Sequence, residues 1–234
     1  MSVSQELVRI RGLRHCYEDG TEALRGVDFS LAAGETVAFL GSNGSGKTTF
    51  LLHLNGLLRG EGEVVVAGLP MLDRNLTSIR RKVGLLFQDP DEQLFLPTVL
   101  DDVAFAPRQF GWSEEKVQER ARTALQQVGL ESGWNRPPYH LSAGEKQRAA
   151  LAGILAMEPE LLALDEPTTH LDPRARRQLI RLLRELPQAK ILVTHDLAFA
   201  QALAARAVFF EEGRILHDGP LLEVARLTGW DRPE

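Results

Sequence analysis

The amino-acid sequence predicts an α/β fold: a mostly parallel sheet with helices on its faces, an antiparallel β part near the amino end and an inserted α-helical lobe. Three observations predict it. Apolar runs of strand length alternate with helical patterns in the first and last parts of the chain. The middle part carries three helical patterns in succession. A buried apolar run at 36–40 leads directly into a glycine-rich loop and a helix, the order found in parallel α/β units.

The amino-terminal strands are expected at 6–11 and 26–31, because alternating apolar runs there are broken by the turn sequences EDGTEA and AAGE. The strand at 36–40 is followed by a helix at 47–57. Two further strands are expected in GEVVVAG and KVGLLFQD. These elements form the first half of the α/β core.

The expected helices of the inserted lobe span 98–109, 113–128 and 142–157. After Glu160 the alternation returns with LLALDEP, a helix from Pro173, AKILVTH, a helix from Asp196 and a strand pair in AVFFEEGRILHDG. The chain is therefore expected to be a single domain, 1–234. Its core takes in 1–89 and 159–234, and its helical subdomain 90–158.

Composition narrows the class of protein. The chain has 234 residues, 44% of them apolar, which suffices for one large core. The net charge is -5 without a long basic block, so nucleic acid is not an expected partner. The most basic segment, 174–185, is interpreted as the solvated face of an amphipathic helix that turns Ile180, Leu182, Leu183 and Leu186 inward.

Cysteine content and hydropathy indicate the compartment. The single cysteine, Cys16, cannot form an internal disulfide, and the amino end shows no secretory or lipidation signal. No apolar run approaches the ~20 residues that cross a bilayer. We therefore expect a cytoplasmic protein that meets any membrane through other proteins.

The sequence GSNGSGKT fits the phosphate-loop pattern G-x-x-x-x-G-K-[ST]. Its glycines permit close backbone approach and positive φ, so that N–H groups converge on phosphate at a helix N-terminus. Lys47 adds a cation for the β and γ phosphates, and the Thr48 hydroxyl is placed for Mg²⁺. The alternative is a plain helix cap with a buried lysine stem. The candidate ATP-binding residues are Gly41, Ser42, Asn43, Gly44, Ser45, Gly46, Lys47, Thr48 and Thr49.

Asp165 and Glu166 follow the buried run LLAL, which places two carboxylates at the carboxyl edge of a parallel sheet. Asp165 is predicted to hold Mg²⁺, directly or through water, and Glu166 to polarise or deprotonate the attacking water. The alternative is a solvated acidic turn. His195 ends a second buried strand at the same edge and is predicted to contact the γ-phosphate or Glu166. The remaining histidines are interpreted as structural or surface residues: His15, His53, His140, His170 and His217.

The sequence LSAGEKQR begins another helix. Ser142 and Glu145 stand three residues apart, which predicts a capping box. Capping does not require Gly144, and a glycine in the first turn exposes N–H groups to an anion at the positive end of the helix dipole. Since the Lys47 loop already serves one nucleotide, this second anion site is expected to serve the nucleotide of another copy.

Together these motifs resemble those of ATP-binding cassette (ABC) ATPases, with a signature motif between a Walker A loop and a Walker B strand. The resemblance implies a P-loop NTPase core that binds ATP and Mg²⁺. It implies that Tyr17 stacks on adenine, that Gln88 is the Q-loop residue and both a metal ligand and catalytic, that Asp172 is the D-loop residue, and that His195 is the switch. It also implies a head-to-tail dimer in which Ser142 and Gly144 meet the partner's ATP.

The chain departs from the family pattern in two places. Ala143 and Glu145 replace the usual glycine and glutamine of the signature. Contact between the backbone N–H at 143 and phosphate is expected to persist, whereas a direct polar contact by Glu145 is not established by the pattern. In the D-loop, Thr169 and His170 resemble the translation-factor branch, but that branch joins two cassettes in one chain and this chain has one.

The segment 83–111 is similar to the ATPases of cobalt-type and energy-coupling-factor importers. The similarity implies a subunit that powers uptake of a transition-metal ion, such as cobalt or nickel, or of a vitamin. It also implies a second ABC ATPase subunit and integral-membrane subunits, hence a place on the inner face of the cell membrane. Leu94, Phe95 and Leu96 are candidate anchors for a membrane partner's helix. Alternatively, they pack the helical lobe against the sheet.

Many energy-coupling ATPases extend further beyond the position of Gly219, so weak dimerisation without nucleotide is expected. Two other functions stay open. A soluble cassette acting on ribosomes or DNA would explain the sequence THLDP, but it predicts a second cassette or a coiled-coil insertion, and neither is visible. A nucleotide-gated regulatory module would be favoured by loss of Glu166 or His195, and both are present.

Overall fold

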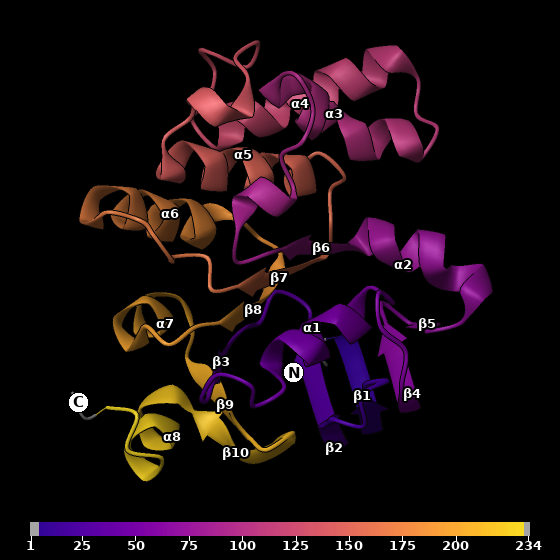
Figure 1. Ribbon diagram of the computed structural model, residues 1–234, viewed down its shortest axis with the longest axis vertical. Coiled ribbons are helices and arrows are strands. Elements are labelled where there is room, and N and C mark those ends of the chain that lie inside the picture. The colour runs from indigo at the N-terminus through magenta and orange to yellow at the C-terminus, as the bar shows by residue number, and fades with distance from the viewer. Residues whose placement is uncertain (1–4, 232–234) are drawn as a thin grey trace. The chain divides into compact units, whose positions relative to one another are not determined.

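A computed structural model describes residues 5–231 of the chain, which form two compact units (Figure 1). The first, here called the sheet unit, comprises the chain up to Leu85, Glu160–Glu166 and the chain from Pro187. The second, here called the helical unit, comprises Leu86–Pro159 and Pro167–Leu186. Relative to the boundaries expected from sequence, residues 167–186 group with the helices rather than with the core.

The sheet unit contains the predicted mostly parallel sheet, in the strand order β10-β9-β3-β8-β7-β6. The strand β3 runs parallel to β8 and β9, and β7 runs parallel to β8, whereas β10 runs antiparallel to β9. Every residue of β7 and β8 is buried, as expected for parallel strands that are covered on both faces. The strand bounds are β3 Thr36–Leu40, β6 Val83–Leu86, β7 Leu161–Asp165, β8 Ala189–Val193, β9 Arg206–Glu211 and β10 Arg214–Pro220.

A second, antiparallel sheet has the order β2-β1-β4-β5 and confirms the predicted β part near the amino end. Its strands are β1 Glu6–Cys16, β2 Glu22–Ala32, β4 Glu61–Val66 and β5 Leu69–Pro70. The first two are longer than predicted. An irregularity around Gly12, where φ is 58° and the N–H bonds to Asp28, breaks the alternation that marks a strand in sequence.

Four helices belong to the sheet unit: α1 Lys47–Leu54, α2 Leu76–Lys82, α7 Leu197–Leu203 and α8 Leu221–Leu227. The helix α1 ends before the predicted residue 57, because Gly56 adopts a left-handed φ of 68°. Sequence analysis did not predict α2 or α8. Each has seven residues and buries one and three of them respectively, which is too short a stretch for a clear helical period.

Aromatic rings hold the core of the sheet unit together. The ring centroid of Phe39 lies 5.2 Å from that of Phe29, 5.1 Å from that of Phe50 and 5.0 Å from that of Phe210. Mostly edge-on packing at this spacing stabilises a core beyond the area it buries. Because these rings come from β2, β3, α1 and β9, they fix the start of α1 against the end of β3.

The helical unit contains α3 Val99–Gln109, α4 Glu114–Gln127, α5 Ala143–Leu155 and α6 Pro173–Glu185. Each begins with a side-chain cap, from Thr98, Ser113, Ser142 and Asp172 respectively. Helix α6 packs on α5, and Arg148 donates a hydrogen bond to Gln178 at 2.9 Å between them. This contact is why residues 167–186 belong to this unit.

Helix α6 is amphipathic, but its buried residues differ in part from those predicted. Leu179 and Leu183 are its fully buried residues, whereas Ile180 and Leu182 are only half-buried. Leu186 is buried just after the helix, as expected.

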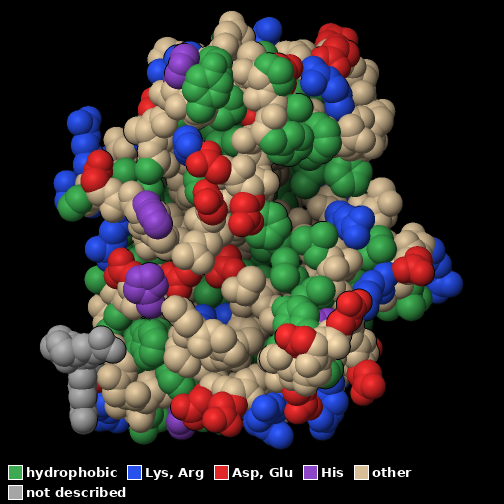
Figure 2. Space-filling model, in the orientation of Figure 1, with side chains coloured by type: hydrophobic (Ala, Val, Ile, Leu, Met, Phe, Trp, Pro, Cys, Tyr) green, Lys and Arg blue, Asp and Glu red, His purple; other side chains and the backbone are tan. Residues whose placement is uncertain are grey.

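On the face shown in Figure 2, basic side chains are scattered among acidic ones. Among residues 5–231, no helix is both long enough and apolar enough to span a bilayer.

Candidate functional site

The glycine loop after β3 can be built only with glycine at two positions. Gly41 and Gly46 have φ of 136° and 105°. A Cβ would lie 2.2 Å from the Phe210 carbonyl oxygen at Gly41, and 2.6 Å from that of Ala23 at Gly46. The backbone therefore passes directly against β2 and β9 and opens into α1. This arrangement fits a phosphate chain, since backbone N–H groups of such a loop point toward an anion that lies at the helix N-terminus.

Lys47 lies folded into this loop. Its Nζ donates to the carbonyl oxygens of Gly41 and Ser42 at 2.7 and 2.8 Å, and to Ser45 Oγ at 3.1 Å. Burial lowers the pKa of Lys47, and the nearby carboxylates of Glu166 and Asp165 oppose that shift. The loop thus holds the positive charge of Lys47 in a largely buried position, where an anion is attracted more strongly than in bulk water.

Thr48 and Asp165 meet at the end of β7. The Thr48 hydroxyl donates to Asp165 Oδ2 at 2.6 Å. Burial raises the pKa of Asp165, while the Thr48 hydrogen bond and the Lys47 charge partly oppose the rise. A hydroxyl and a carboxylate are oxygen ligands of the kind that Mg²⁺ prefers, so these two residues fit the predicted metal.

Glu166 directly follows β7 and has a φ of 44°, in the left-handed region. Its Oε2 lies 2.8 Å from His195 Nδ1 and accepts the backbone N–H of His195 at 3.3 Å. Glu166 is buried, whereas the side chain of His195 is 68% exposed. Such a strained backbone must be held by its surroundings, here by the hydrogen bond from Glu166 N to Val193 O at 2.9 Å.

Tyr17 follows β1 and is tied to the glycine loop. Its hydroxyl lies 2.9 Å from Thr49 Oγ1, and its ring meets the edge of His15 at a centroid distance of 4.7 Å. His53 Nδ1 donates to the Thr49 carbonyl at 2.7 Å, and its ring packs against His15. The structure thus places Tyr17 and Thr49 side by side. His53 is buried inside the unit, and burial lowers its pKa.

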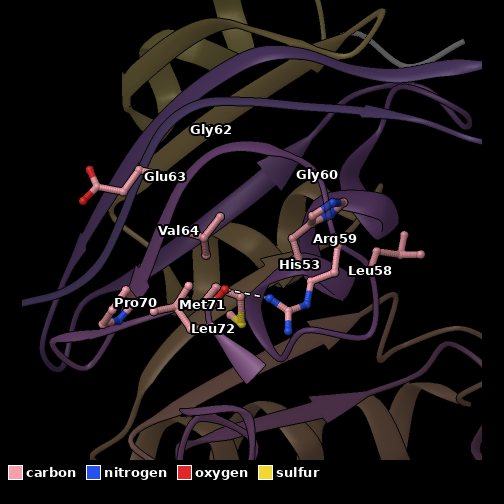
Figure 3. A pocket seen from close by; sticks show the side chains of 10 residues that line it. All are labelled: His53, Leu58, Arg59, Gly60, Gly62, Glu63, Val64, Pro70, Met71 and Leu72. Atoms are coloured by element: carbon pink, nitrogen blue, oxygen red, sulfur yellow. Dashed lines mark hydrogen bonds between the residues drawn. The ribbon is translucent and has the colours of Figure 1, made fainter. Parts of the chain in front are cut away.

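A cavity of about 250 Å³ lies beside His53 (Figure 3). The guanidinium of Arg59 points across it and donates to the Met71 carbonyl at 2.6 Å. The remaining walls come largely from β4 and β5, with Val64 and Pro70 among them. None of the site residues predicted from sequence lines this cavity, so it is separate from the glycine loop.

In the helical unit, the capping box predicted at Ser142 is confirmed. The Ser142 hydroxyl and N–H both donate to Glu145 Oε2, at 2.8 and 2.9 Å, and the Glu145 N–H donates back to Ser142 Oγ at 3.4 Å. These hydrogen bonds from Ser142 lower the pKa of Glu145, and Arg136 adds to the effect.

Gly144 has a packing reason that the sequence did not reveal. A Cβ at this position would lie 2.8 Å from Ala175 Cβ on α6. The glycine therefore permits close contact of two helices, in addition to any exposure of N–H groups. At the start of α6, Asp172 accepts hydrogen bonds from the N–H groups of Arg174 and Ala175, at 2.7 and 2.8 Å.

A cavity of about 480 Å³ in the helical unit brings three of the predicted motifs together. It is lined by Gln88, by Ala143 of the signature sequence, and by Thr169 and His170 before α6. Lys146, which also lines it, forms an ion pair with Asp91 at 2.7 Å. Gln88 is exposed.

Asp102 was missed in the sequence. It is buried, and its Oδ1 accepts the N–H groups of Phe95 and Leu96, both at 3.0 Å. Burial raises its pKa. The sequence gives no signal for this role, because the Phe95 and Leu96 N–H groups reach Asp102 only through the fold. Leu94 of this segment is buried, whereas Phe95 is 62% exposed. The role of Leu94, Phe95 and Leu96 as anchors for a membrane partner stays a prediction.

Comparison with known proteins decides the family. A family profile described as ABC transporter matches residues 24–169, more than half of the 234-residue chain. The chain belongs to the ABC transporter family. Its matched region includes the glycine loop, the signature sequence and the carboxylates after β7.

Several relatives place this ABC ATPase in a branch. It is 46% identical to the energy-coupling factor transporter ATP-binding protein EcfA of Methanothermobacter thermautotrophicus, over 94% of this chain and 73% of that protein. It is 44% identical to EcfA of Methanocaldococcus jannaschii, over 93% and 80%. The chain is an ABC ATPase of the energy-coupling-factor and cobalt type.

Solved structures of ATP-binding cassettes support the same family assignment. The structure of cbiO1 from Clostridium perfringens, part of the ABC transporter complex cbiONQ, matches with a TM-score of 0.84 and 34% identity, over 95% of this chain and 92% of that chain. A dimeric ATP-binding cassette in a post-hydrolysis state, bound to ADP and Pi, matches with a TM-score of 0.82 and 30% identity, over 92% and 99%. This ABC ATPase binds ATP with Mg²⁺ and couples ATP hydrolysis to transport.

Proposed function

We propose that this chain is the ATP-hydrolysing subunit of an energy-coupling-factor type importer for a transition-metal ion, such as cobalt or nickel, or for a vitamin. The observation that carries the enzymatic part is the edge of the sheet where Lys47, Thr48, Asp165, Glu166 and His195 come together. The importer part is supported by the segment 83–111 and by relatives named EcfA and cbiO1.

Different residues of the proposed site bind the phosphates, the adenine and the Mg²⁺ of MgATP. The loop from Gly41 to Thr49 receives the phosphates through its N–H groups and Lys47, and Tyr17 stacks on the adenine. Thr48, Asp165 and Gln88 would hold Mg²⁺. When bound, Mg²⁺ supplies positive charge that offsets the charge on the phosphate oxygens.

Hydrolysis is assigned to Glu166. Its buried carboxylate orients the attacking water and accepts its proton as the water adds in line to the γ-phosphorus and the bond to the β-phosphate oxygen breaks. His195 Nδ1 lies 2.8 Å from this carboxylate and the His195 side chain is exposed, so we assign to His195 the contact with the γ-phosphate. ADP and inorganic phosphate are the products.

The site is completed by a second ABC ATPase subunit, identical or related. Ser142 and Gly144 of one subunit, at the N-terminus of α5, contact the ATP held by the other, and Asp172 lies at the interface. ATP closes the pair and hydrolysis reopens it. The supporting observation is that Gln88 and the signature residue Ala143 line one cavity of the helical unit.

Membrane subunits receive this motion at the segment after Gln88. Phe95 is 62% exposed and packs edge-on against Phe105, itself 39% exposed, at a centroid distance of 5.3 Å. Two adjacent exposed aromatic rings are suitable apolar anchors for the helix of a partner protein. The chain is accordingly assigned to the inner face of the cell membrane through integral-membrane subunits, with no nucleic-acid partner.

The first test is the specific ATPase activity of the purified protein as a function of its concentration. If two copies build each site, the activity per molecule rises steeply with concentration, and Ser142→Arg abolishes it. Ser113→Arg is the matched control, because Ser113 caps α4 of the same unit in the same way and has no assigned role. Constant activity per molecule and an active Ser142→Arg variant would refute the shared site.

The importer part is tested by purifying the chain from its own membranes. Recovery with an integral-membrane subunit is expected. Recovery with ribosomes or DNA in place of a membrane subunit would instead favour a soluble cassette.

A further inference from the structure

Ser142 of the signature sequence lies next to a negatively charged side chain, that of Glu145. Glu145 Oε2 accepts both the hydroxyl and the N–H of Ser142, at 2.8 and 2.9 Å. In the proposed site the same hydroxyl must face a phosphate group that is itself negatively charged. An isolated carboxylate at this distance would repel that phosphate, the more so as water leaves the closing interface.

Arg136 lies on the other oxygen of the same carboxylate. Its Nη2 is 3.2 Å from Glu145 Oε1, and the Glu145 side chain is 27% exposed. The ion pair therefore leaves Oε2 on Ser142 and places a cation within the same small cluster. Ser142, Glu145 and Arg136 together carry no net charge, whereas Ser142 and Glu145 alone carry one negative charge.

The position of Arg136 is built into the loop before α5. Its N–H donates to the Gly133 carbonyl at 2.9 Å, and its own carbonyl accepts the N–H of Val99 at 3.1 Å. Gly133 has a φ of 109°, and a Cβ there would lie 2.3 Å from Arg136 Nε. The side chain thus lies directly over a residue that must be glycine, and its backbone is anchored to α3.

We propose that Arg136 is a positioning residue of the signature site: it neutralises Glu145, so that Ser142 can face the γ-phosphate held by the other subunit. This role rests on the proposed two-copy site. On approach of the phosphate, the Ser142 hydroxyl proton turns from Glu145 to the phosphate oxygen. Glu145 stays paired with Arg136 and goes on accepting the Ser142 N–H, which keeps α5 capped.

The test is a double-mutant cycle in a Glu166→Gln parent, in which ATP accumulates the closed dimer. The measured quantity is the ATP concentration that gives half-maximal dimerisation by light scattering. Arg136→Ala is expected to raise it by about tenfold, the size of coupling usual within one charged network. Glu145→Gln removes the charge that Arg136 neutralises, so adding it to Arg136→Ala is expected to restore the parent value to within about twofold.

Arg120→Ala is the matched control, because it removes an arginine from a comparable ion pair, Arg120 with Glu158 at 3.1 Å, in the same unit. It is expected to leave dimerisation unchanged. Arg136→Lys retains a cation and is expected to retain most of the affinity. Should Arg136→Ala fold poorly in a thermal unfolding check, Arg136→Gln keeps the length of the stem and loses only the charge.

Two results overturn the role given to Arg136 while leaving the two-copy site intact. One is an unchanged ATP requirement in Arg136→Ala or Arg136→Gln. The other is a double variant with Glu145→Gln that stays as weak as the single one, because Arg136 would then act on the phosphate or the fold and not through Glu145. A parent that stays monomeric at every ATP concentration overturns the two-copy site itself, and this role with it.

Discussion

Asp165 and Glu166 are neighbours in the chain, but their surroundings differ. Asp165 still belongs to β7, is paired with the Thr48 hydroxyl at 2.6 Å, and has a pKa raised by burial. Glu166 has left the strand with a φ of 44° and meets His195 instead. The two neighbouring carboxylates thus have different partners, as the different roles proposed for them require.

Replacing Glu166 by Gln keeps the size of the side chain and removes the proton acceptor. Turnover is expected to fall by about 10²- to 10⁴-fold, the usual contribution of a general base, while ATP-dependent dimerisation persists. Phosphate release and light scattering measure the two effects. Glu160→Gln, an exposed acid in the same unit, serves as the control. Turnover unchanged in Glu166→Gln would exclude the assigned role.

Asp102 links residue chemistry to stability. Burial raises its pKa in the folded protein, so folding favours the protonated form. Its stabilising contribution is fully present below the unfolded-state pKa of about 3.9 and is lost as pH rises through the folded pKa. Asp102→Asn keeps an acceptor for the Phe95 and Leu96 N–H groups without ionising. Its free energy of unfolding relative to wild type should therefore rise with pH across this window.

Urea unfolding at a series of pH values measures that difference. A difference that stays flat across the window would contradict the prediction. Asp102→Ala is the companion variant: it removes the acceptor of two partly buried hydrogen bonds, from the Phe95 and Leu96 N–H groups, and should lower the free energy of unfolding by about 1–3 kcal/mol.

At the scale of elements, α5 and α6 show how one glycine serves packing. The first turn of α5 approaches α6 so closely that a Cβ at Gly144 would meet Ala175 Cβ at 2.8 Å. Arg148 and Gln178 then join the two helices by a hydrogen bond at 2.9 Å. The contact fixes the start of α5, where Ser142 lies, against the start of α6, where Asp172 lies.

Gly144→Ala is expected to lower the free energy of unfolding by about 1–3 kcal/mol, the usual cost of overpacking. Ala175→Gly removes the atom that the new methyl group meets, so the double variant should regain most of the loss. Chemical denaturation measures the stability and ATPase activity the function. If the double variant regains stability but not activity, Gly144 also serves the phosphate; if neither returns, packing against Ala175 is not the reason for the glycine.

At the scale of the whole molecule, the two units carry different parts of the proposed site. The sheet unit holds Lys47, Asp165 and Glu166, and the helical unit holds Ser142 and Asp172. The helical unit also carries the exposed pair Phe95 and Phe105, next to the segment that begins at Gln88.

Phe95→Ser should abolish co-purification with a membrane subunit and leave the ATPase activity of the isolated chain within about twofold, because an exposed side chain contributes little to folding. The matched control is Leu222→Ser, which alters a similarly exposed apolar residue, 68% exposed, on α8 of the sheet unit. Pull-down from membranes measures the association. Undiminished recovery of Phe95→Ser with its partner would show that this surface is not the contact.

Much of the fold and of the candidate site follows from the sequence alone. Strand-length apolar runs, helical patterns and the glycine loop predicted the α/β class and most strands and helices, and the capping box at Ser142 predicted the start of α5. The confirmed family rests on the same residues. These features are local in sequence: a motif or a period determines them over fewer than about twenty residues.

The tertiary structure decided what depends on contacts between distant segments. It decided that Gly144 is opposite Ala175, that Arg136 meets Glu145 over Gly133, and that Asp102 holds the Phe95 segment. It also placed α6 with the other helices. A sequence pattern records which residue types stand near one another along the chain. Which atoms meet across the fold depends on packing, and packing is set only when all elements are placed together.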